Sequence, residues 1–211
     1  MKKNLLNFCL LIAVGFAAVV FTSCNGEEPQ FESGDIYIIA NNVIDSSDEI
    51  ARVQMKTDNV VFHTLYQNHG FTMFISGILV YEHLESITRF FGHQDITSSD
   101  ENAKWFVINF LDALNSENVS IGRLAFINSD KNNWCEEVWI YADRDVTVKC
   151  SGEVTEISVN LNLNKGWNNV YVHINQISPI ANEVRITTDK PSGMDFRWHF
   201  IPWQDGDNNT K

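Results

Sequence analysis

Histidines are the side chains of this chain best suited to metal chemistry. The densest histidine region contains His63, His69, His83 and His93. None of their spacings matches a recognised zinc-ligand pattern. His63 and His69 flank an expected turn and could approach each other across a hairpin, but exposed strand histidines explain the pair more simply. The segments 129–133 and 205–209 have the composition of a turn or a tail, and neither combines the loop glycine with the distal glutamate of a calcium loop. We therefore expect no metal and no cofactor.

Adjacent carboxylates offer a second kind of chemistry, general acid–base catalysis. Glu136 and Glu137 are neighbours in an expected strand, so they point to opposite faces and cannot converge on one substrate. The chain also lacks a Gly-x-Ser-x-Gly nucleophile elbow and a glycine-rich phosphate loop. We expect no catalytic residues. An enzyme built from distant loops, or an accessory subunit acting on extracellular polysaccharide, is the alternative.

Aromatic and amide side chains form the strongest candidate for binding. They lie in two expected strands, one before Asp143 and one after Gly166: Trp139, Tyr141, Trp167, Asn168, Asn169, Tyr171 and His173. If Val138 and Val170 face the core, the aromatic rings face outward, where they could stack on sugars or protein groups while the amides bind hydroxyls. The alternative is that these large rings are themselves core, as is common in sandwiches. Sequence alone leaves both open.

These side chains depend on strands for their position. The clearest strand is 156–163, where Ile157, Val159, Leu161 and Leu163 alternate with polar residues. We expect it to form a hairpin with the segment 170–174. An even loop at Lys165–Gly166 pairs apolar residues with one another, and Gly166 then takes the positive φ of such turns. The expected pairs are Leu161 with Val170, Val159 with Val172 and Ile157 with Ile174.

Short apolar runs separated by turn residues recur along the rest of the chain, which indicates an all-β fold. They are 35–40, 51–57, 60–66, 71–76, 121–127, 137–142, 183–188 and 196–201. We expect an antiparallel β-sandwich, immunoglobulin-like or jelly-roll-like, with at most one or two short helices. Residues 104–114 fit both helical and strand spacing, and strand is favoured by their Trp-Phe-Val-Ile core. Residues 81–91 are a helical candidate.

Cys135 and Cys150 flank two expected strands that turn at Asp143–Arg144. Val138, Ile140, Val146 and Val148 share one face, which Cys150 shares as well, whereas Cys135 lies on the other face. An oxidising compartment permits a disulfide between these two cysteines. The strand geometry instead favours two separate half-buried thiols.

The N-terminus has the layout of a secretory signal peptide. Lys2 and Lys3 precede an apolar run and then small residues. The segment "FTSC" resembles the lipobox of bacterial lipoproteins, with Phe21 in place of the usual leucine. This resemblance implies a signal peptide at 1–23 and lipidation of Cys24. The polar, turn-rich residues that follow indicate a tether at 24–34. The remaining length suits a single domain at 35–203, followed by a polar tail at 204–211. The membrane is then a partner through the lipid.

The segment "NGEEP" after Cys24 resembles the acidic export signal of Bacteroides-type lipoproteins, which implies an outer-membrane protein exposed on the cell surface. Residues 135–200 also resemble the C-terminal half of Bacteroides-type envelope lipoproteins with β-sandwich domains, most specifically in "LNKGWN". That resemblance implies an architecture and brings no catalytic residue. The net charge of -12 argues against a nucleic-acid partner. We expect a non-catalytic surface protein that binds a glycan or a protein, or a structural envelope module.

Overall fold

A computed structural model describes residues 34–56, 61–87, 96–129, 134–151, 157–178 and 181–203. All of these residues belong to one compact unit, Ser33–Lys211. The expected signal peptide, Cys24, nearly all of the expected tether and the expected tail at 204–211 lie outside the described residues, as does His93.

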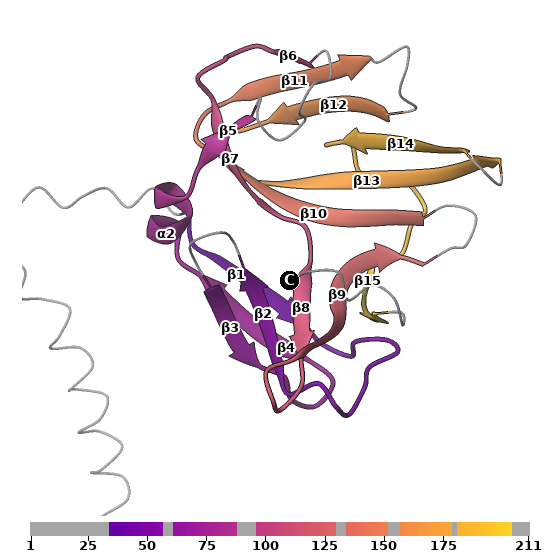
Figure 1. The fold of residues 1–211 in the computed structure, drawn as a ribbon. Coiled ribbons are helices and arrows are strands. Elements are labelled where there is room, and N and C mark those ends of the chain that lie inside the picture. The colour runs from indigo at the N-terminus through magenta and orange to yellow at the C-terminus, as the bar shows by residue number, and fades with distance from the viewer. Residues whose placement is uncertain are drawn as a thin grey trace, which may run out of the picture. The chain divides into compact units, whose positions relative to one another are not determined.

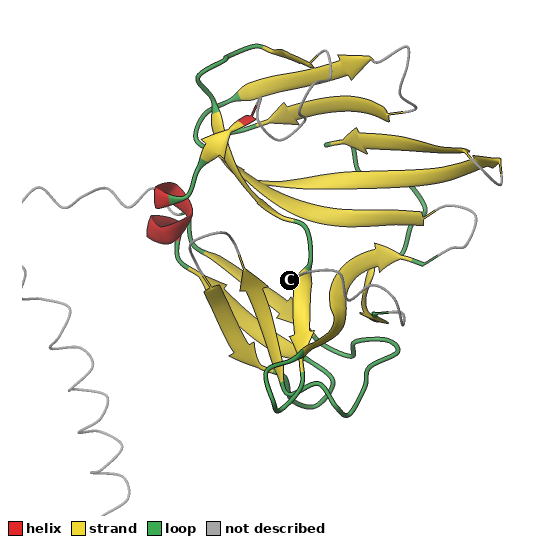
Figure 2. Cartoon of the chain, viewed as in Figure 1, coloured by secondary structure: helices red, strands yellow, loops and turns green. Residues whose placement is uncertain are grey.

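The described residues form mainly β-strands, joined by short loops and a short helix, α2 (Gly77–Glu82) (Figures 1 and 2). The all-β, sandwich-like fold expected from the sequence is confirmed. The strands are β1 (Ile36–Ala40), β2 (Arg52–Lys56), β3 (Val61–Leu65), β4 (Phe71–Ile75), β5 (Glu85–Ser86), β6 (Ile96–Ser98), β7 (Lys104–Ile108), β8 (Leu111–Leu114), β9 (Ser120–Asn128), β10 (Trp134–Ala142), β11 (Val146–Ser151), β12 (Ile157–Leu163), β13 (Gly166–Ser178), β14 (Ala181–Thr187) and β15 (Arg197–Pro202).

Two segments with helical spacing in the sequence, 104–114 and 81–91, differ in how well the prediction fits the structure. Residues 104–114 form β7 and β8, so the strand prediction is confirmed. The helix expected at 81–91 is interrupted in its described part, because α2 ends at Glu82, Glu85 and Ser86 form β5, and only Ile87 is helical again. Glu85 and Ser86 pair with Trp105 and Lys104 of β7, so backbone pairing to the sheet outweighs the local helical spacing.

Strand pairing is mostly antiparallel. One sheet runs in the order β3-β2-β8-β9-β10-β13-β14-β12-β11-β6, with β15 paired to β9 and β7 to β10. β1 and β4 form a separate two-stranded sheet. β3 lies beside β4, since the Thr64 hydroxyl donates a 2.9 Å hydrogen bond to the carbonyl of Thr72. β1 therefore has β4 on one side and no strand of the described chain on the other.

Buried apolar residues form two clusters that share a wall made by β7 and β10. The first core lies among β1, β2, β4, β8 and β15, and the second lies among β11, β12 and β13. On β10, Tyr141 faces the first core while Val138 and Ile140 face the second; on β7, Phe106 faces the first and Trp105 the second. Since strand residues alternate between faces, these two strands are apolar on both. Figure 1 shows β10 between β13 and the strands around β1.

The expected hairpin between β12 and β13 is wrong, although its apolar faces are right. Val159, Leu161 and Val170 all lie in the second core, but β14 runs between the two strands, antiparallel to β13 and parallel to β12. Alternation decides which face a residue occupies and does not decide its neighbouring strand. Gly166 has φ +100° as expected.

Asn168 joins the two strands where β14 ends. Its side-chain oxygen accepts a hydrogen bond from the backbone N–H of Asn164 at 2.9 Å. Its amide group donates to the carbonyls of Asn164 and Gly166 at 2.8 and 2.9 Å, and to that of Ile140 at 3.4 Å. This buried amide replaces the backbone bonds that a closed hairpin would have made.

β10 and β11 likewise do not pair with each other, because β10 pairs with β7, β9 and β13 while β11 pairs with β6 and β12. Cys150 lies in the second core, as do Val138 and Val148. Cys135 is fully buried but belongs to neither core cluster. No disulfide joins the two thiols.

Candidate ligand-binding pocket

Most of the aromatic and amide residues predicted as a binding surface lie on one face of two neighbouring strands. β10 and β13 are antiparallel partners, and their register sets Trp139 opposite Asn169 and Tyr141 opposite Trp167. Directly opposed side chains on one face are close enough to interact. The sequence therefore placed these residues on a common face, and β-pairing brings them together. Asn168 points to the other face and bridges to Asn164.

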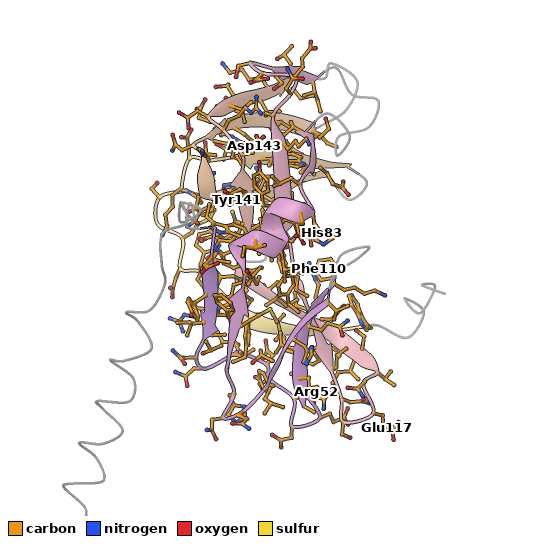
Figure 3. All side chains as sticks on the ribbon, turned by 90° about the vertical axis from the view of Figure 1, so that its left-hand side faces the viewer. Arg52, His83, Phe110, Glu117, Tyr141 and Asp143 are labelled. Atoms are coloured by element: carbon orange, nitrogen blue, oxygen red, sulfur yellow. The ribbon has the colours of Figure 1, made fainter. Side chains whose placement is uncertain are left out.

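The outward orientation of this face is wrong for most of its members. Tyr141 and Tyr171 are buried, with 5% and 3% of their surfaces exposed, and Trp167 packs against the first core. Asn168 is buried, His173 is partly buried and Asn169 is exposed. Figure 3 shows Tyr141 below Asp143 and above Phe110, and a Cβ on Gly34 would lie 3.3 Å from its ring. The alternative that the large aromatics are core holds here, because segments distant in sequence cover this face.

Trp139 is partly exposed and lines a pocket of about 450 Å³. A volume of this size lies within the range of small-ligand sites. The lining residues are Ile36, Tyr37, Ile38, Ile39, Asn41, Phe126, Trp139 and Trp198. They come from β1 and the residue after it, and from β9, β10 and β15, so the pocket lies where β1 meets the strands that pack across from it.

Three aromatic rings form one wall of the pocket. The rings of Trp139 and Trp198 are stacked, with centroids 5.7 Å apart and an interplanar angle of 21°. Phe126 stacks on Trp139 at 6.2 Å and lies 5.5 Å from Trp198. Each stacked pair fixes the orientation of its rings. Packing thus holds an apolar wall in place before any ligand arrives.

Two indole N–H groups hold the β1 side of the pocket. Trp198 Nε1 donates a 3.2 Å hydrogen bond to the carbonyl of Ile39, and Trp167 Nε1 donates a 2.7 Å bond to that of Gly34. Gly34 also lies against Gly77 at the start of α2, so closely that a Cβ on Gly77 would come within 2.6 Å of the Gly34 backbone. The ends of the segment 34–39 are therefore fixed.

Glu137 and Cys135 lie on the same face of β10 as Trp139, beyond the pocket, and the pKa of each is raised. Burial raises the pKa of Glu137, opposed by the charge of Lys190 and by a hydrogen bond from Tyr171. Burial, and then the charges of Glu137 and Glu136, raise the pKa of Cys135 to about 12. Because the thiolate is the reactive form of cysteine, Cys135 is a poor nucleophile.

The described histidines are scattered over the fold. His63 is exposed on β3. His69 Nδ1 lies 3.1 Å from Ser46 Oγ, which in turn lies 2.7 Å from the Tyr66 hydroxyl. These contacts tie together the two loops that carry Ser46 and His69. No group of three or more histidine, cysteine or acidic side chains converges within the described ranges.

The sequence contains little signal for the complete pocket. Trp139 is found by alternation along β10, but Trp198 and Phe126 join it only through pairing of β15 with β9. Ile36–Ile39 arrive from the opposite end of the chain. No helix in the described part of the chain is both long enough and apolar enough to cross a membrane. No protein-family model, curated protein or solved structure matches this chain.

Proposed function

We propose that this chain is a non-catalytic binding protein, anchored to the outer membrane by a lipid on Cys24 and displayed on the cell surface. Its binding site is the pocket beside Trp139, and its ligand is a glycan or a segment of another protein. One observation carries the proposal: a preformed aromatic pocket of about 450 Å³, with stacked Trp139 and Trp198 in its wall. Apolar walls with a few polar groups are typical of binding sites.

The binding part of the proposal is tested with two probes, a glycan array and a random peptide display library, each offered to the full-length chain in detergent. Trp139→Ala removes the pocket wall, and Trp134→Ala removes a tryptophan of the same strand that does not line the pocket. We expect ligands that bind the wild type and Trp134→Ala but lose at least tenfold in affinity for Trp139→Ala. The absence of any ligand at high micromolar concentration would contradict the proposal.

The anchoring part of the proposal rests on the leader and is tested separately. Cys24→Ala should leave an unprocessed precursor that incorporates no labelled palmitate, whereas Cys150→Ala should be acylated like the wild type. Protease treatment of intact cells should digest the acylated domain. Palmitate incorporation into Cys24→Ala would refute the assignment of the lipid.

A further inference from the structure

Within the described chain, the edge of β1 that faces the pocket has backbone groups that pair with no other strand. The carbonyl of Ile39 accepts its hydrogen bond from Trp198, on the side of β1 away from β4, whereas the carbonyl of Ala40 faces Gly70 on the β4 side. The N–H and C=O of one strand residue point to the same side, and the side alternates along the strand. The N–H of Ile39 and both backbone groups of Tyr37 therefore point away from β4. No strand of the described chain pairs with them.

The lining of the pocket supports this orientation. Four consecutive residues of the chain, Ile36 to Ile39, line it, although Ile38 has its side chain in the first core. Side chains of consecutive strand residues alternate between faces, so an unbroken run of lining residues means that the backbone edge itself borders the pocket. None of the described side chains in the lining carries a charge.

The outer face of the β1–β4 sheet is apolar as well. Tyr37, Ile39 and Phe74 are 63%, 57% and 46% exposed, and the rings of Tyr37 and Phe74 are in contact with centroids 4.9 Å apart. A strand added beside β1 would extend this face with one set of alternate side chains. Its other set would enter the pocket against Trp139, Phe126 and Trp198. Both environments are uncharged, which specifies an apolar segment.

We propose that the ligand of the pocket is an extended, uncharged segment of another protein that pairs as a strand with the free edge of β1. This deepens the proposed function and rests on it. Strand addition supplies affinity through main-chain hydrogen bonds and specificity through pockets for alternate side chains. The unpaired groups extend from Tyr37 to the N–H of Ile39, because the carbonyl of Ile39 is bonded to Trp198. At roughly 3.3 Å per residue, these three residues offer about 10 Å for pairing.

A glycan fits the same geometry less well. It presents many hydroxyl groups that need partners when buried, and the lining side chains with polar groups are those of Asn41, Tyr37 and the two tryptophans, one of which is already bonded to Ile39.

The decisive variant is Tyr37→Pro, which removes one N–H from the free edge without removing a β1–β4 hydrogen bond. Proline is tolerated at such edge positions. Tyr37→Val is the matched control because it loses the ring and keeps the N–H. The probes are peptides selected from a random decapeptide display library on the full-length chain in detergent, with counter-selection on Trp139→Ala. Versions of each selected peptide, N-methylated at odd or at even amides, test the same hydrogen bonds from the ligand side.

We expect selected peptides to be apolar and uncharged, and to bind Tyr37→Pro at least about tenfold more weakly than Tyr37→Val, which shares the loss of the ring and keeps the N–H. N-methylation of one set of amides should abolish binding while the other set is tolerated. Equal binding to the two Tyr37 variants, together with tolerance of both methylated sets, would overturn strand addition while Trp139-dependent binding stands.

The remaining outcomes are also decisive. A glycan that binds through Trp139 when no peptide does would overturn strand addition and leave the pocket as a glycan site. A dimer of the chain that Tyr37→Pro dissociates would show that the partner is a second copy. Failure of every glycan and every peptide to bind would contradict the proposed function itself.

Discussion

The indole rings of Trp139 and Trp198 lie nearly parallel, 5.7 Å apart, although they belong to strands that do not pair with each other. The two rings differ in burial, since Trp198 belongs to the first core and Trp139 packs against it from the pocket side. We therefore expect Trp198→Ala and Trp139→Ala to lower the free energy of unfolding by different amounts.

Trp198→Ala should lower the free energy of unfolding by about 3–5 kcal/mol, because it leaves a cavity in the core. Trp139→Ala should cost less, about 1–3 kcal/mol, since a partly exposed ring loses less buried area and one stacking contact. Urea unfolding followed by circular dichroism measures both. Equal losses for the two variants would show that Trp139 is a core residue and that the pocket wall is not separable from folding.

Asn168→Ala should destabilise the fold by about 2–4 kcal/mol. The substitution leaves the N–H of Asn164 and the carbonyls of Asn164, Gly166 and Ile140 without their side-chain partner, and a buried group left unsatisfied costs about 1–3 kcal/mol. Asn160→Ala, at an exposed position on β12, is the control and should change stability by less than about 0.5 kcal/mol. A similar result for both asparagines would mean that β12 and β13 are held together in another way.

Glu137 should make the protein less stable as the pH rises above 4.5. Burial raises the pKa of this carboxyl above its ordinary 4.5, so the folded state binds the proton more tightly than the unfolded state. The contribution of Glu137 to the unfolding free energy is then greatest below pH 4.5 and declines as the pH rises through the raised pKa. Glu137→Gln removes that decline.

The measurement is urea unfolding of wild type and Glu137→Gln between pH 4 and pH 8. The stability of the variant relative to wild type should increase across this range. The exposed Glu183→Gln controls for the loss of one negative charge. A relative stability of Glu137→Gln that falls as the pH rises would contradict the raised pKa.

Cys135 should be unreactive in the folded protein. Its thiol is buried and its pKa is raised to about 12, so at pH 8 we expect alkylation by iodoacetamide at least about a hundredfold slower than in guanidinium chloride. Mass spectrometry of the digested protein separates this cysteine from the others. A peptide pair joined by a Cys135–Cys150 disulfide, or rapid labelling of the native thiol, would disprove this account of the residue.

The strand content of the fold can be predicted from the sequence because alternation and turn residues are local. Alternation along the strands also places four residues correctly in one core: Val138, Ile140, Val146 and Val148. The neighbour of each strand cannot be predicted in this way, because any strand with an apolar face on the same side can pair with it. β14 occupies the place expected for β13 beside β12, and the buried amide of Asn168 compensates where the strands separate.

The candidate site is predictable only in part for a related reason. Alternation identifies Trp139 and Asn169 as residues of one face, but β10 is apolar on both faces, so hydrophobicity cannot show which one is covered. The Tyr141 ring lies against Gly34, which precedes β1, and Trp139 stacks on Trp198 of β15. Contacts between such distant segments have no local signature in a single sequence.

The most direct test of the central claim is the affinity of selected ligands for the full-length chain and for Trp139→Ala, with Trp134→Ala as the control, measured by titration calorimetry. The account predicts that Trp134→Ala binds like the wild type and that Trp139→Ala loses at least tenfold while remaining folded. Unchanged affinity of a folded Trp139→Ala for every ligand would contradict the claim that this pocket is the binding site.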